Sequence, residues 1–231
     1  LPRTPGYLGK KERGAMIHLH HARGSRSFRV LWLLEELGLD YALTGYDFAD
    51  GSLRAPEHLA RSPAGKVPAL EIDGAALFES GAIVQLLTEQ AGRLAPKPGE
   101  PERADFLQWL HFAETQAICL QNLNIQHNFI RPAEARSIPT IKLETRRLAV
   151  TARALEARLT GRAHLLDSGF SAADCMFGFN VRSLGYFLPR ADYPAVFGWW
   201  DRMRERPACA RALDREGGEM FDRDFYEIPN G

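Results

Sequence analysis

A proline-rich stretch at residues 94–101 separates two parts of the chain whose apolar residues repeat with different periods. Before it, short apolar runs alternate with segments in which apolar residues recur at helical spacing. After it, almost every apolar segment has the helical period. This change is typical of a linker between an α/β domain and an all-α domain. The 231 residues are therefore predicted to form two domains of different class.

The part before the linker predicts the element order βαβαββα. Gly38 follows the last apolar position of the first helical segment, where glycine commonly ends a helix. Asp73-Gly74 lies between two short apolar runs and predicts a two-residue β-hairpin. A parallel crossover therefore comes first and a hairpin comes last. The expected strands are residues 16–20, 41–46, 67–72 and 75–78, and the expected helices are residues 30–37, 52–61 and 80–90.

The part after the linker predicts only helices. Ser171 and Asp174 have the spacing of a capping box in which Asp replaces the usual Glu, so a helix is expected to begin at Ser171. Residues 1–15 show no hydrophobic period and are expected to form a disordered leader. The expected helices are residues 101–130, 140–160, 171–186 and 193–206, with another from about 207.

The charges of the chain are balanced, with 29 Lys and Arg against 29 Asp and Glu, and there is no long basic run. This balance gives no electrostatic reason to expect a polyanionic partner, so no nucleic-acid partner is predicted. No apolar run approaches the roughly 20 residues that span a bilayer, and the first residues lack the apolar stretch of a secretory signal. We therefore expect no membrane partner and a cytoplasmic location.

Histidines and cysteines are the candidate metal ligands of this sequence. His18 and His20 share one face of the expected strand and could hold a metal together. No Asp, Glu or Cys lies at ligand spacing from them in the sequence, so surface or cross-strand histidines are favoured and no metal is expected. Cys119, Cys175 and Cys209 lie far apart in apolar helical segments, which favours inert buried thiols over a disulfide, a zinc site or a nucleophile.

Four motifs carry a resemblance to a known family. They are Gly24-Ser25-Arg26-Ser27 with the helix that follows it, residues 65–70, residues 78–83 and residues 170–174. In this order and spacing they resemble the cytosolic glutathione transferases, and the first is most similar to bacterial and fungal members whose first helix opens with Ser-Arg. The resemblance covers nearly the whole chain from Met16. It implies a thioredoxin-like glutathione-binding domain at 16–92, a linker at 93–101 and an all-helical domain at 102–231.

Glutathione carries two carboxylates, one ammonium and one thiol, and the resemblance assigns residues to these groups. The helix that begins at Ser80 is expected to bind the γ-glutamyl carboxylate through its N-terminus, and Glu79 to meet the ammonium. The alternative is that Ser80 only caps its helix. In the family, a cis Pro68 next to Val67 lets the backbone of residue 67 pair with the cysteinyl part of glutathione like an added strand. Lys66 is expected to meet the glycyl carboxylate.

The catalytic Ser, Tyr or Cys of the family lies in the loop before the first helix. An ungapped comparison places Gly24 on the catalytic position of the serine-type classes and Arg26 on that of the cysteine-type classes. The loop has no Tyr or Cys. We expect Ser25 to stabilise the glutathione thiolate, with Arg26 as the second candidate. The alternative is that Ser25 only caps the helix and backbone amides hold the thiolate.

The helix predicted at 101–130 carries candidate residues for an electrophile pocket. By resemblance they are Trp109, His111, Phe112 and Thr115, although an aromatic stripe at helical spacing is also typical of plain core. The resemblance thus implies a homodimeric glutathione transferase of the detoxification type, with glutathione as co-substrate and a small hydrophobic electrophile. The alternatives are glutathione-dependent peroxide or disulfide reduction and a non-catalytic, partner-binding protein of the same fold.

Overall fold

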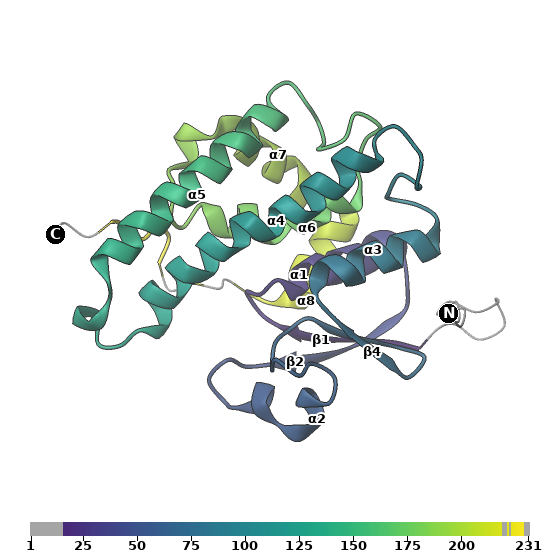
Figure 1. Cartoon of the computed structure of the whole chain (residues 1–231), viewed down its shortest axis with the longest axis horizontal. Coiled ribbons are helices and arrows are strands. Elements are labelled where there is room, and N and C mark those ends of the chain that lie inside the picture. Colours follow the sequence, from purple (N-terminus) through teal and green to yellow (C-terminus); the bar gives the residue numbers. More distant parts are fainter. Residues whose placement is uncertain (1–15, 219–220, 222, 229–231) are drawn as a thin grey trace. The chain divides into compact units, whose positions relative to one another are not determined.

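The computed structural model describes residues 16–218, 221 and 223–228 (Figure 1). The expected leader, residues 1–15, lies outside the described residues. The chain divides into two compact units, which are described one at a time. Among the described residues, the first unit consists of residues 16–100 with Arg206–Gly218, and the second of Pro101–Glu205 with residues 221 and 223–228.

The first unit is built on a four-stranded sheet with the order β2-β1-β3-β4. β1 pairs with β2 in parallel and with β3 in antiparallel, and β3 pairs with β4 in antiparallel. The predicted order βαβαββα is therefore confirmed. Its elements are β1 (Ile17–Ala22), α1 (Ser27–Leu37), β2 (Tyr41–Tyr46), α2 (Pro56–Leu59), β3 (Ala69–Ile72), β4 (Ala75–Phe78) and α3 (Ser80–Ala91).

Local backbone rules explain where these elements begin and end. Gly38 follows α1 with a φ of 61°, the left-handed conformation that glycine adopts without steric cost. Asp73 and Gly74 both have positive φ, as a type I′ hairpin turn requires. The helix expected at 52–61 is divided, because Pro56 has no N–H to continue the preceding 3-10 turn and instead opens α2.

The pleat of β1 separates its side chains into two sets. Ile17 and Leu19 are buried in the core, whereas His18 and His20 point to the opposite face of the sheet. Figure 1 shows α1 and α3 on the core side of the sheet and α2 on the other side. The core is formed mainly by α1, whose residues Phe28, Val30, Leu31, Trp32, Leu33 and Leu34 are fully buried.

Helix α8 (Pro207–Glu216) belongs to the first unit, where it packs against α1. The predicted helical domain, residues 102–231, included this helix, so the structure differs from the prediction here. Charge complementarity supports the observed packing, because Arg206 forms an ion pair with Glu36 of α1 at 2.8 Å. The buried face of α8 contains Ala208, Cys209 and Ala212.

The second unit is helical, as predicted. Helix α4 packs against both α5 and α6. The helix expected at 101–130 ends its α-helical part at Asn124 and continues as a π-helical turn, Ile125–Phe129. The helices are α4 (Arg103–Asn124), α5 (Ile138–Leu159), α6 (Ala172–Leu184) and α7 (Pro194–Arg204).

Within the described part of the chain, none of the helices combines the length and the apolar character needed to cross a membrane.

The capping box predicted at the start of α6 is confirmed. Asp174 Oδ2 accepts the backbone N–H of Ser171 at 2.9 Å. Its Oδ1 also accepts the backbone N–H of Leu165 at 3.2 Å and the indole N–H of Trp199 at 3.1 Å. Burial raises the pKa of this carboxyl, although the backbone N–H donors oppose the rise. One side chain thus joins α6, α7 and the segment before α6.

We predict that Asp174→Ala destabilises the second unit strongly. The substitution leaves three buried donors without their acceptor, and each costs about 1–3 kcal/mol, so the free energy of unfolding should fall by at least about 3 kcal/mol. Urea denaturation followed by tryptophan fluorescence measures the change. The matched control is Asp201→Ala, which removes the exposed ion pair with Arg190 and should cost less than about 1 kcal/mol. Equal losses in both variants would contradict the role given to Asp174.

Candidate functional site

The sheet brings the three predicted binding segments to one edge. His20 of β1 lies opposite Ala69 of β3, and Ala69 lies opposite Phe78 of β4. The end of β1, the start of β3 and the end of β4 therefore meet at the same edge. The segments attached there are residues 23–26, 66–68 and 79–80.

A glutamate at the end of helix α8 forms a hydrogen bond with the loop after β1. Gly24 has a φ of 68°, and its N–H donates to Glu216 Oε1 at 2.8 Å. Both groups are buried, so this charge-assisted hydrogen bond is shielded from water. The sequence does not indicate Glu216 as a partner of this loop, because the two are 192 positions apart.

Ser25 begins a chain of hydrogen-bonded side chains in this loop. Its hydroxyl lies 2.5 Å from that of Ser27, and the Ser27 hydroxyl lies 2.7 Å from Nδ1 of His21. All three residues are buried. Ser25 Oγ also accepts the backbone N–H of Ser27 at 3.2 Å, so it does satisfy one donor at the start of α1. The sequence indicates Ser25 as a candidate but gives Ser27 and His21 no role at the site, because their contacts with Ser25 appear only in the folded chain.

The order of protons along this chain decides what Ser25 can do. When His21 Nδ1 carries its proton, it donates to Ser27, and the Ser27 hydroxyl can then donate to Ser25 or to the backbone carbonyl of Ala22 at 3.3 Å. Donation to Ser25 leaves the Ser25 hydroxyl to donate outside the chain. In the opposite arrangement Ser25 donates to Ser27 and offers no proton elsewhere. The tautomer of His21 therefore influences whether Ser25 donates within this chain or outside it. Arg26, the second candidate, is partly exposed at the N-cap position of α1.

Helix α3 begins at Ser80, and its N-cap residue is Glu79. Ser80 therefore does not occupy the capping position. Its buried hydroxyl accepts a hydrogen bond of 3.0 Å from an Nη atom of Arg29, a fully buried residue of α1. A guanidinium and a helix N-terminus both favour an anion at this point. Arg29 is not among the residues predicted for the site, although it is a lone cation within the apolar run 28–34, which is a usable sequence signal.

Glu79 has an unusual backbone conformation for a residue other than glycine. Its φ is 74° and its ψ is 108°, and its side chain is exposed. A sparsely populated conformation of this kind costs about 1–3 kcal/mol and is found most often at functional sites.

The segment before β3 contains the predicted cis bond, Val67–Pro68. Lys66 beside it is exposed, which leaves its side chain accessible to a ligand. The Lys66 backbone is held on both sides: its N–H donates to Ser62 Oγ at 3.3 Å, and its carbonyl accepts from His58 Nε2 at 3.1 Å.

The four candidate pocket residues of α4 do not share one environment. Trp109 is buried and Phe112 is partly buried, and both rings contact Phe177 of α6, with centroids 6.0 and 6.5 Å from it. His111 and Thr115 lie on the adjacent face of the helix and are exposed. The structure therefore places Trp109 and Phe112 together against Phe177, and it places His111 and Thr115 together on an exposed face of α4.

The prediction of buried cysteines is confirmed. Cys119, Cys175 and Cys209 are free thiols and are buried. Burial, followed by the nearby carboxylate of Glu144, raises the pKa of Cys119 to about 11. A thiol of this kind is a poor nucleophile at neutral pH.

Comparison with known proteins defines the family. Residues 15–89 match the glutathione S-transferase N-terminal domain, and residues 119–207 match the C-terminal domain. The disulfide-bond oxidoreductase YfcG of Escherichia coli is 34% identical, with 86% of this chain and 94% of that protein covered. Glutathione S-transferase 3 of Schizosaccharomyces pombe is 29% identical, with 87% and 88% covered.

Solved structures of similar fold also come from glutathione transferases. The glutathione transferase URE2P6 of Phanerochaete chrysosporium, in complex with oxidized glutathione, has a TM-score of 0.79 and 27% identity over 88% of this chain and 97% of that one. A glutathione transferase of Burkholderia graminis, with two glutathione molecules bound per subunit, has a TM-score of 0.78 and 28% identity over 86% and 88%. This chain belongs to the glutathione S-transferase family. The predicted family and fold class are confirmed.

Proposed function

We propose that this protein is a glutathione transferase that conjugates glutathione to small hydrophobic electrophiles. The observation that supports this most is the meeting of residues 23–26, 66–68 and 79–80 at one edge of the sheet. Each segment supplies a different kind of group, and together they match the different groups of glutathione. Relatives solved with glutathione support the same ligand. The reaction itself needs no metal and no prosthetic group.

In the proposed complex, the charges of glutathione meet opposite charges or dipoles. The γ-glutamyl carboxylate lies at Ser80 and the N-terminus of α3, with the Arg29 guanidinium behind the Ser80 hydroxyl. Glu79 meets the ammonium. The cysteinyl backbone pairs with Val67 beside Pro68, in the manner of an added strand. The exposed Lys66 meets the glycyl carboxylate.

The proposed chemistry is nucleophilic attack by the sulfur. Ser25 donates its hydroxyl proton in a hydrogen bond to the thiolate, and His21 and Ser27 set the direction of that donor. With an aryl halide, a sulfur–carbon bond forms and the carbon–halogen bond breaks, with the halide taking the electron pair. On α4, we propose Trp109 and Phe112 as apolar contacts of the electrophile and His111 and Thr115 as polar ones.

A second candidate is glutathione-dependent disulfide reduction, which the similarity to YfcG favours. One glutathione thiolate attacks a substrate disulfide and releases a thiol. A second glutathione attacks the mixed disulfide, which releases the other thiol and forms glutathione disulfide. Two electrons thus pass from two glutathione thiols to one disulfide, and no protein cysteine takes part.

Two assays on the same purified chain distinguish these candidates. One follows an aryl chloride with glutathione, and the other follows a small dialkyl disulfide with glutathione, NADPH and glutathione reductase. Turnover of the dialkyl disulfide, with no turnover of the aryl chloride, would favour disulfide reduction as the function. Glutathione binding without turnover in either assay would favour a non-catalytic, partner-binding protein.

We predict that Ser80→Ala weakens glutathione binding. The substitution removes a hydrogen bond to a charged group, worth about 1.5–3 kcal/mol, so the Kd should rise roughly 10-fold to 150-fold. Isothermal titration calorimetry measures the change. The matched control is Ser137→Ala, which removes the N-cap of α5, where Ser137 Oγ accepts the N–H of Thr140. The control should lose stability without losing affinity, and unchanged affinity in Ser80→Ala would leave this serine a purely structural role.

We predict that Ser25→Ala lowers activity in a pH-dependent way. A free thiol has a pKa of about 8.5, and lowering it by about 2 units needs about 2.7 kcal/mol of preferential stabilisation of the thiolate. One hydroxyl donor supplies about 1.5–3 kcal/mol. At pH 6.5, kcat/KM toward an aryl chloride should therefore fall roughly 10-fold or more. The loss should shrink near pH 9, where the thiol ionises unaided.

Arg26→Ala is the competing variant in this experiment. If Ser25→Ala keeps full activity at pH 6.5 and Arg26→Ala loses it, Arg26 rather than Ser25 serves the sulfur. If neither variant changes the pH profile, backbone amides hold the thiolate. The glutathione Kd is measured in parallel, so that loss of binding is separated from loss of thiolate stabilisation.

We also propose that the protein is a homodimer, as the family resemblance implies. Light scattering at micromolar concentration should give twice the chain mass of 25.9 kDa. A stable monomer under these conditions would contradict the proposal.

A further inference from the structure

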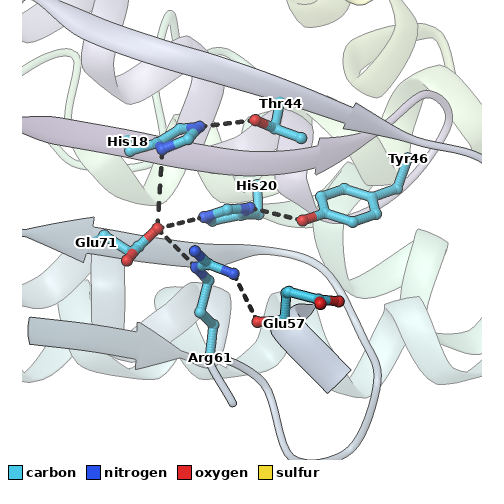
Figure 2. A network of polar contacts seen from close by, with 7 residues as sticks. All are labelled: His18, His20, Thr44, Tyr46, Glu57, Arg61 and Glu71. Atoms are coloured by element: carbon cyan, nitrogen blue, oxygen red, sulfur yellow. Dashed lines mark hydrogen bonds and ion pairs between the residues drawn. The ribbon is translucent and has the colours of Figure 1, made fainter. Parts of the chain in front are cut away.

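Two histidines and a glutamate converge on the face of the sheet opposite α1. His18 and His20 come from β1, and Glu71 comes from β3. In the antiparallel register His18 lies directly opposite Glu71. Figure 2 shows the two imidazole rings and the carboxylate pointing toward one another. No carboxylate lies at ligand spacing from these histidines in the sequence, but strand pairing brings Glu71 to His18 from 53 positions away.

The distances in this cluster are short. Nε2 of His20 lies 2.8 Å from Glu71 Oε1, and Nδ1 of His18 lies 3.8 Å from the same oxygen. One potential ligand atom from each residue lies within 4.8 Å of the others. Ligands of a tetrahedral zinc ion at about 2.0–2.1 Å lie about 3.3 Å from each other, so these atoms need to move by about 1.5 Å at most.

Hydroxyl groups hold the opposite side of each imidazole ring (Figure 2). Nε2 of His18 is hydrogen bonded to Thr44 Oγ1 at 2.7 Å, and Nδ1 of His20 to Tyr46 Oη at 2.9 Å. His20 Nε2 donates to the Glu71 carboxylate at 2.8 Å, so an ion at this point takes the place of that proton. When Nε2 of His18 and Nδ1 of His20 carry the protons and donate to the hydroxyls, the other nitrogen of each ring presents its lone pair to the ion. Fixing a histidine through its second nitrogen is the usual arrangement around a protein metal site.

We propose that His18, His20 and Glu71 form a binding site for a divalent transition-metal ion of the zinc type. Two imidazoles and one carboxylate are ligands that Zn²⁺ accepts, and three protein ligands leave a fourth position for water. The site is open enough for an ion to enter, because 34% of the His18 side chain is exposed. It lies on the opposite face of the sheet from the Ser25–Ser27–His21 chain.

Arg61 competes with the ion for the carboxylate. Its Nε donates to Glu71 Oε1 at 2.7 Å, and one Nη donates to the backbone carbonyl of Glu57 at 2.5 Å. The Arg61 side chain is 31% exposed, so it has room to move away from Glu71. This competition gives the proposal a distinctive consequence, because removing Arg61 should strengthen metal binding.

Zinc binding to the metal-free full-length chain tests the proposal by isothermal titration calorimetry with ZnCl₂. One Zn²⁺ ion should bind per chain. His18→Ala and Glu71→Gln should each weaken binding about 100-fold or more, and loss of an orienting group in Tyr46→Phe about 10-fold to 100-fold. Arg61→Gln should tighten binding. His111→Ala, which removes an exposed histidine of α4, is the matched control and should leave zinc affinity unchanged.

X-ray absorption of the zinc-loaded chain should show nitrogen and oxygen ligands at about 2.0–2.2 Å, with imidazole scattering that decreases in His18→Ala. Circular dichroism of each variant checks folding. His20→Ala should also weaken zinc binding, and if this variant does not fold, His18→Ala and Glu71→Gln provide the test. Absence of stoichiometric binding at micromolar zinc would overturn the proposal. So would zinc affinity that is unchanged in both His18→Ala and Glu71→Gln.

Discussion

β1 pairs with a neighbouring strand on each of its two sides, and the rest of the first unit depends on this pairing. β1 lies between β2 and β3, so its register fixes the positions of two neighbours at once. Side chains alternate along the strand, which sends Leu19 into the core and His18 and His20 to the opposite face. The same register with β3 brings the three proposed glutathione-binding segments to one edge and places Glu71 beside the two histidines.

The buried guanidinium of Arg29 connects stability with ligand binding. Burying a charge costs several kcal/mol unless other groups compensate for the lost hydration. Arg29 is fully buried within an otherwise apolar part of α1, and it donates to Ser80 at the first position of α3. A positive charge placed behind a helix N-terminus strengthens the attraction for an anion there. The packing of α1 against α3 thus builds the electrostatics of the proposed carboxylate site.

The proposed sulfur chemistry depends on a hydroxyl rather than on a protein thiol. The three cysteines are buried within helices α4, α6 and α8, whereas Ser25 lies in the loop after β1 and heads a hydrogen-bonded chain that ends at His21. A single donor to a thiolate supplies about as much free energy as a useful shift of a thiol pKa requires. Conjugation and disulfide reduction both begin with the same thiolate, so one arrangement of residues serves either proposed reaction. The second reactant distinguishes them.

Residues close together in the chain made part of this structure predictable. Gly38, the Asp73-Gly74 turn and the Ser171–Asp174 capping box act through backbone conformation and nearby hydrogen bonds, and all appear where the sequence placed them. The motifs also indicated Ser25, Val67-Pro68 and Glu79-Ser80 as candidate site residues. Only the tertiary structure decided which groups support them: Arg29 reaches Ser80 across 51 positions, and Glu216 reaches Gly24 across 192. Such contacts depend on strand order, register and helix packing, which local residue preferences do not determine. For the same reason, the sequence showed two histidines on one face of a strand, and only the register of β1 with β3 placed Glu71 beside them.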